Sequence, residues 1–243
     1  MKNSIIILMV LLISGCGTLS VPTPGIDLSP DINVNAPAQQ QTQPQTVQYE
    51  RNAFRMMSTY FFSVGGIWPW QKEFKPGQWC KWQMKTQGET NKAELALLKR
   101  MKNNREWWRM RMNLENKKNE MIFESLINST DYSLRRLRSK MGEGEPHEVP
   151  IAEGSYIQKP IKLTQESVSA ATVGQTKVSV PAGDFTCDHV KYGDITGKGT
   201  MELWVNYDVP GGVVKYRFEA NGDSYTVELI DYGTGAKTVL NSY

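Results

Sequence analysis

Alternation of apolar and polar residues with a period of two constrains the fold of this chain more than any other feature. Between residues 77 and 86, Cys80, Trp82 and Met84 alternate with lysines and a glutamine. Successive side chains of a strand point to opposite faces of a sheet, so this pattern predicts a strand with one buried and one solvated face. From the same pattern and the turns between segments, we expect strands at residues 77–86, 105–114, 121–126, 168–171, 177–180, 185–191, 201–207, 213–219 and 225–231. Residues 134–141 fit either a strand or a helix.

Turn signals separate the predicted strands and indicate how they connect. Pro181-Ala182-Gly183, Pro210-Gly211-Gly212 and Asn221-Gly222 each join two strand candidates, and such residues favour tight turns. Residues 49–62 instead repeat apolar side chains at steps of three and four, which predicts an amphipathic helix. We therefore expect a mainly β fold with minor α content. The strands should form an antiparallel meander, as a curved sheet or an incomplete barrel with an N-terminal helix.

The first residues have the composition of a cleaved secretory signal. Lys2 precedes an apolar run at residues 5–13, which is shorter than the roughly 20 residues that span a membrane as a helix. Ile13-Ser14-Gly15-Cys16 then resembles the lipobox of bacterial lipoproteins. This resemblance implies that residues 1–15 are removed and that Cys16 carries acyl chains such as palmitate. The alternative is an ordinary secretory signal with a chance cysteine at its end.

The lipobox also implies where the protein resides. Two or three acyl chains hold a protein stably at a membrane, so we expect a lipid-anchored protein of the cell envelope. Gly17 stands where related lipoproteins often carry an aspartate that retains them at the inner membrane, which favours the outer membrane, on either its periplasmic or its surface side. Residues 16–48, rich in proline and glutamine, form the predicted tether. Residues 49–243 then form a single β-rich domain.

The residue types that carry catalysis or bind metals are sparse and poorly spaced. His147 and His189 are the two histidines, and neither lies in a metal-ligand cluster or beside a nucleophile motif. Asp184, Asp188 and Asp194 lack the spacing of a calcium loop and are interpreted as solvated carboxylates. We therefore predict no catalytic residue, no metal and no cofactor, and no enzymatic activity.

Basic residues cluster at 99–118 and at 135–140, although the whole chain holds 28 Lys and Arg against 25 Asp and Glu. We interpret these clusters as the solvated face of a sheet. Anionic lipid or lipopolysaccharide phosphates are an alternative partner, whereas an envelope location argues against nucleic acid. Cys80 and Cys187 are the cysteines that remain beside Cys16. An oxidising compartment permits a disulfide between them, and two buried thiols are the alternative.

One set of large apolar residues is assigned by alternation to the same face of the sheet. Methionines adapt their shape to a flexible apolar ligand, so this face is the candidate for an apolar cavity; a densely packed core is the alternative. Trp204 lies out of phase with the set. Its members are Trp82, Met84, Trp108, Met110, Met112, Met201, Leu203 and Tyr216.

The C-terminal part carries two turn motifs within a recurring pattern. Val178-Ser179-Val180-Pro181-Ala182-Gly183-Asp184-Phe185 and, later, Val209-Pro210-Gly211-Gly212-Val213-Val214-Lys215 resemble those of uncharacterised envelope proteins related to the LolA/LolB-like lipoprotein-carrier superfamily. The resemblance covers residues 178–232 well and 77–126 loosely. It implies an incomplete barrel around a helix, with an apolar cavity that takes lipid chains. This chain departs from the pattern by carrying its own anchor and tether.

Two functions follow as expectations. The first is a membrane-anchored envelope lipoprotein that binds an apolar ligand, a lipid or an acylated protein, in its curved sheet. The second is an interaction module with a filled core that docks on a protein partner in an envelope complex. An open cavity would favour the first function, and unbroken packing the second.

Overall fold

The computed structural model describes residues 42–62, 73–85, 90–113, 118–157, 164–193, 199–220 and 223–243. The predicted signal, Cys16 and the tether up to residue 41 lie outside these ranges. The elements are α1 (Thr42–Phe62), β1 (Trp79–Lys85), β2 (Thr90–Arg100), β3 (Arg105–Met112), β4 (Met121–Asn128), β5 (Leu134–Met141), β6 (His147–Glu148), α2 (Gln165–Ala171), β7 (Thr172–Val180), β8 (Gly183–Gly193), β9 (Gly199–Val205), β10 (Val213–Ala220) and β11 (Asp223–Gly233).

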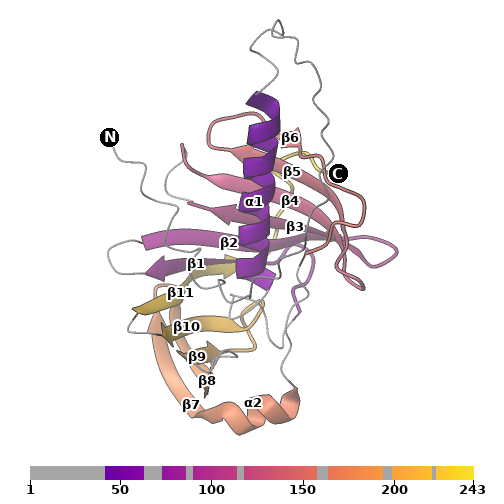
Figure 1. Cartoon of the computed structure of the whole chain (residues 1–243). Helices are drawn as coiled ribbons and strands as arrows, with labels where there is room; N and C mark the ends of the chain where they lie inside the picture. The colour runs from indigo at the N-terminus through magenta and orange to yellow at the C-terminus, as the bar shows by residue number, and fades with distance from the viewer. Residues whose placement is uncertain are drawn as a thin grey trace, which may run out of the picture. The chain divides into compact units, whose positions relative to one another are not determined.

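All eleven strands belong to one antiparallel sheet in the order β6-β5-β4-β3-β2-β1-β11-β10-β9-β8-β7. Two meanders, β1 to β6 and β7 to β11, are joined where β1 pairs with β11, as Figure 1 shows. The sheet is strongly curved. The backbone N–H of Ala182, in the β7–β8 turn, donates a hydrogen bond to the Leu229 carbonyl on β11 at 3.2 Å. Because β9 and β10 separate β8 from β11 in the strand order, the curvature of the sheet brings these two groups into contact. The sheet is nevertheless open, with β6 and β7 as edges. The predicted mainly β fold is confirmed.

Most predicted strands are present, and residues 134–141 form a strand. The prediction of a strand at residues 168–171 is wrong, because they belong to α2. Thr164 caps this helix: its Oγ1 accepts a hydrogen bond from the Ser167 backbone N–H at 3.2 Å. Strand β2 was not predicted. Its residues 93–98 are buried on both faces, so the segment shows no alternation.

Helix α1 lies across the β1–β5 half of the sheet (Figure 1), and we call the face that it covers the inner face. The helix begins at Thr42, inside the segment predicted as a tether. Ala53, Phe54, Met57 and Phe61 are its buried apolar residues, and the Phe54 ring meets Phe123 of β4 edge-on at 5.5 Å. This spacing gives the apolar stripe that predicted a helix here.

The C-terminal segment after β11 covers part of the opposite face, which we call the outer face. A second apolar cluster there holds Ala96, Leu98, Trp107 and Leu126, with Ala236 from this segment packed against it. The Tyr243 ring lies 5.9 Å from that of Trp107. Strands β2 to β4 are therefore buried on both faces.

Candidate functional site

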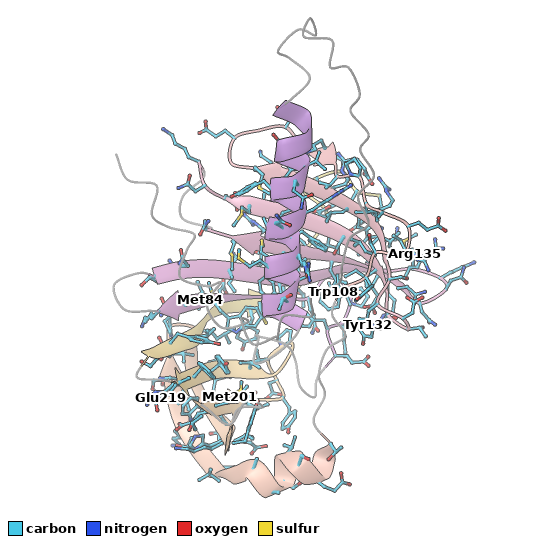
Figure 2. All side chains as sticks on the ribbon, viewed as in Figure 1. Met84, Trp108, Tyr132, Arg135, Met201 and Glu219 are labelled. Carbon is cyan, nitrogen blue, oxygen red and sulfur yellow. The ribbon has the colours of Figure 1, made fainter. Side chains whose placement is uncertain are left out.

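The eight residues predicted for the apolar face all lie in one buried cluster with α1. Their exposed fractions run from 0% for Trp82, Met110 and Leu203 to 8% for Met84. Met84 and Trp108 lie on the half of the sheet that α1 crosses, and Met201 lies on the other half (Figure 2). Alternation thus brings together side chains from four strands, β1, β3, β9 and β10, and packed apolar atoms surround them. That this face binds a ligand stays a prediction.

The polar atoms of these large residues find partners that hold the rings in place. The indole N–H of Trp82 donates to the Val213 carbonyl at 3.1 Å. Trp108 donates to the Glu106 carboxylate at 3.0 Å, and the hydroxyls of Tyr216 and Tyr225 lie 2.9 Å apart. Buried indole and phenol groups need such partners. The inner face is therefore a well-ordered apolar surface.

Trp204, assigned by alternation to the opposite phase, is only partly buried. Its ring stacks on His189 with the centroids 4.8 Å apart, and the Lys215 ammonium lies 5.6 Å from its centroid. His189 in turn lies 3.3 Å from the Glu202 carboxylate. Both faces of the indole are thus occupied by neighbours from the same sheet.

Sequence reasoning missed several polar side chains beneath α1. Ser125 and Ser139, on β4 and β5, are fully buried, and the Ser125 hydroxyl makes no hydrogen bond within the described part of the chain. Glu50 of α1 is 1% exposed and lies 2.9 Å from the Nε2 of His147. The signal for Ser125 was present, since it lies in phase with Phe123 and Ile127 on β4. Glu50 gave no such signal, because its partner is distant in sequence.

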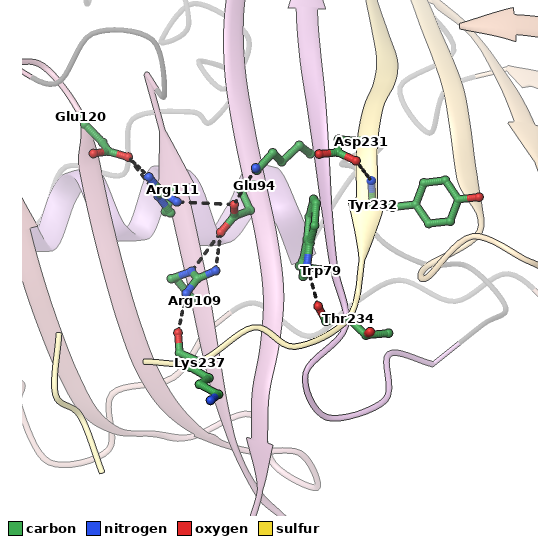
Figure 3. A network of polar contacts seen from close by, with 10 residues as sticks. Trp79, Glu94, Arg109, Arg111, Glu120, Asp231, Tyr232, Thr234 and Lys237 are labelled. Atoms are coloured by element: carbon green, nitrogen blue, oxygen red, sulfur yellow. Dashed lines mark hydrogen bonds and ion pairs between the residues drawn. The ribbon is translucent and has the colours of Figure 1, made fainter. Parts of the chain in front are cut away.

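The outer face of β1 to β4 carries a charged network (Figure 3). Glu94, 2% exposed, accepts a hydrogen bond from the Arg109 Nε at 2.9 Å and lies within 3.5 Å of Arg111. Arg111 also contacts Glu120 at 2.5 Å, and Arg109 donates to the Lys237 carbonyl at 2.6 Å. The interpretation of residues 99–118 as a solvated basic face is therefore wrong for Arg109, which is 6% exposed. The C-terminal segment covers it, and paired carboxylates neutralise this part of the basic cluster.

A second buried carboxylate fastens the C-terminal segment to the sheet. Glu124 is fully buried, and the Thr238 hydroxyl, the Val239 N–H and the Ser242 hydroxyl donate to it at 2.6, 2.7 and 2.5 Å. Arg136 of β5 donates to the Ser242 carbonyl at 3.3 Å. Several donors to one ionised acceptor form strong hydrogen bonds, so Glu124 is the main polar anchor of this segment.

The two cysteines of the domain are free in the structure, which corresponds to the second of the two alternatives. Cys80 Sγ lies 3.1 Å from the Pro210 carbonyl, and three strands lie between β1 and β8 in the sheet. Burial, reinforced by the Asp231 charge, raises the pKa of Cys80 well above its usual value. Burial and then the Asp188 charge raise the pKa of Cys187 to about 11. Both thiols are therefore protonated at neutral pH and poor nucleophiles.

Metal ligands do not gather in the part of the chain that the structure describes: it holds no group of three His, Cys, Asp or Glu side chains that could bind an ion. Asp184 and Asp188 lie on β8, and Asp194 falls outside the described residues. None of the described helices is long and apolar enough to cross a membrane.

No family model and no curated protein matches the sequence. Among solved structures, the Pseudomonas aeruginosa MucA/MucB complex is similar at 10% identity and a TM-score of 0.44; the match covers 82% of this chain and 61% of that one. LprF from Mycobacterium bovis is similar at 11% identity and a TM-score of 0.32, covering 82% of this chain and 97% of that one. The hypothetical protein CT021 from Chlamydia trachomatis matches at 9% identity and a TM-score of 0.37, covering 68% and 90%. These scores are too low to argue fold or function, which rest on this chain's own residues.

Proposed function

We propose that this chain is a lipid-anchored, non-enzymatic protein of the cell envelope that binds an apolar ligand on the inner face of its sheet. The ligand is an acyl chain, either free or attached to a protein. One observation carries the proposal: apolar side chains from distant strands form a single continuous face, and an amphipathic helix covers it. The lipobox-like motif at Cys16 and the resemblance to the LolA/LolB-like superfamily support the location and the ligand class.

The chemistry of the inner face suits such a ligand. Met84, Met110, Met112 and Met201 are half of the predicted set, and their thioether side chains adapt to varied shapes. Helix α1 fills this face with Phe54, Met57 and Phe61, the kind of apolar surface that an acyl chain presents. An acyl chain would therefore displace α1 from the inner face and make apolar contacts similar to those that α1 makes there.

A fluorescent fatty acid tests the proposal on a chain that starts at Gly17. We expect saturable binding and energy transfer from Trp82 and Trp108, which lie on the inner face, to the bound probe. Trp82→Phe should lower this transfer, whereas Trp204→Phe, on the other phase of the sheet, should change it less. Absence of saturable binding would contradict the ligand-binding function.

Lipidation is tested by replacing Cys16 with serine. The thioether that anchors a lipoprotein needs the cysteine sulfur, so we expect an unprocessed precursor or release of the protein from membranes. Metabolic labelling with a clickable fatty acid and detergent-phase partitioning measure the two effects. Equal labelling of the Cys16→Ser protein would refute lipidation at this residue.

The interaction module is the second candidate function, and the burial of the inner face favours it. Trp82 and Met110 are 0% exposed, as expected for a core that is already filled. In this case the protein would dock on an envelope partner through its outer surface, and the fatty acid would not bind. The substitution of Met110, argued in the Discussion, separates the two.

A further inference from the structure

The contact between Glu50 and His147 joins α1 to the edge of the sheet. Glu50 lies on α1 and is 1% exposed, whereas His147 lies on β6 with 46% of its side chain exposed. His147 Nε2 lies 2.9 Å from Glu50 Oε2, and its Nδ1 lies 3.2 Å from the Glu145 carbonyl oxygen. Nδ1 therefore faces a carbonyl oxygen, which only accepts a hydrogen bond, and Nε2 faces a carboxyl oxygen, which only accepts when Glu50 is ionised.

The protonation state of the ring decides whether both contacts can form. A neutral imidazole has one N–H and one bare nitrogen, whereas an imidazolium has two N–H donors. With Glu50 ionised, only the imidazolium donates to both oxygens at once. The Ser139 hydroxyl, 3.4 Å from Nε2, lies farther away than Glu50. Loss of the proton therefore removes one of the two hydrogen bonds, and it removes the opposite charge beside a buried carboxylate.

We propose that Glu50 and His147 form a pH-sensitive latch, which holds α1 against the inner face when His147 is protonated and loosens when His147 is neutral. The latch itself follows from the geometry of the pair. That it controls ligand access to the inner face rests on the proposed function.

Two further attachments of α1 in the described part of the chain differ from this pair, because neither changes charge near neutral pH. Arg51, the next residue of the helix, donates from Nε to the Pro150 carbonyl at 2.7 Å, and arginine stays charged. Farther along α1 the contacts with the sheet are apolar, through Phe54, Met57 and Phe61. His147 is thus the titrating group among these attachments that changes charge near neutral pH.

The charged neighbours of the pair set the direction of the pH dependence. Burial lowers the pKa of His147, but the hydrogen bonds to Glu50 and the Glu145 carbonyl, with the Glu50 charge, outweigh it and raise this pKa above its usual value. Arg138 of β5 opposes them, while Glu148 of β6 lies 3.9 Å from Arg138. A raised pKa in the folded state means that the latch is fully formed below the ordinary histidine pKa of about 6.5. It is lost as pH rises through the higher folded value.

Hydrogen exchange of the full chain, without any ligand, tests the latch. The protection of peptides from α1 is measured between pH 5.5 and 8.5, corrected for the intrinsic exchange rate and compared with peptides from β3 and β4. We expect protection of α1 to fall severalfold across this range while β3 and β4 change little. His147→Gln keeps a donor that does not titrate, so α1 should then show constant protection.

His189→Gln is the matched control, because His189 also pairs with a glutamate but lies on β8; this variant should keep the wild-type pH dependence. Glu50→Gln should abolish it, as His147→Gln does. A flat profile in the wild type, or an unchanged fall in His147→Gln, would overturn the latch. If the fall is present but fatty acids bind at no pH, the latch stands and the ligand-binding function fails.

Discussion

Replacing Glu124 by alanine should lower the free energy of unfolding by about 3–5 kcal/mol, because three donors lose the fully buried carboxylate that accepts from them. Thr238, Val239 and Ser242 all donate to this carboxylate. The hydroxyls can rotate toward other groups, but the Val239 N–H is fixed by the backbone and would stay unpaired. The C-terminal segment should then leave the outer face and expose Trp107.

Urea denaturation followed by tryptophan fluorescence measures the free energy of unfolding. In a thermal melt, the Tm should fall by roughly 6–20 °C for a domain of this size. Glu219→Ala is the matched control: the Glu219 side chain is 47% exposed and pairs with Arg217 on the same strand. Exposed ion pairs contribute little, so this variant should change stability by less than about 1 kcal/mol. Equal stability of the two variants would show that Glu124 does not anchor the segment.

The inner face was predictable because burial on one face leaves a period of two in the sequence. Trp82, Met110 and Leu203 share that face although they lie on three strands far apart in the chain. The prediction of strands failed for a segment that is buried on both faces and for one that is too short to show a period. Strand β2 is buried on both faces, so Ala93 to Leu98 lack alternation and are rich in helix formers. Residues of α2 were mistaken for a strand because the segment is too short for periodicity to decide.

The polar contacts could not be predicted, because their partners are distant in sequence. Glu124 bonds to Ser242 across 118 positions, and Glu50 meets His147 across 97. The alternation of residues in the sequence indicates which face of a strand a side chain occupies. It does not indicate which strands are neighbours in the sheet or which face the C-terminal segment covers. The cluster of basic residues illustrates the consequence. It was interpreted as solvated, yet Arg109 is covered by the C-terminal segment and paired with Glu94.

Replacing Met110 by arginine separates the two candidate functions. Met110 is fully buried on β3, within the cluster that α1 covers. If α1 can leave the inner face, the guanidinium becomes hydrated there, so the sheet should stay folded while fatty acid binding is abolished. If the inner face is a permanently filled core, the charge is buried without a partner, which costs several kcal/mol. The domain should then unfold.

The ligand-binding function predicts the first result. Circular dichroism should show an unchanged β signal, hydrogen exchange should show loss of protection in α1, and the fluorescent fatty acid should no longer bind. Met101→Arg is the matched control: this methionine directly follows β2 and is 39% exposed, so the same substitution should alter neither folding nor binding. Unfolding of Met110→Arg, with a wild type that binds no fatty acid, would decide for the interaction module. A displaceable α1 would make the inner face a binding surface, whereas a fixed one would make it a core.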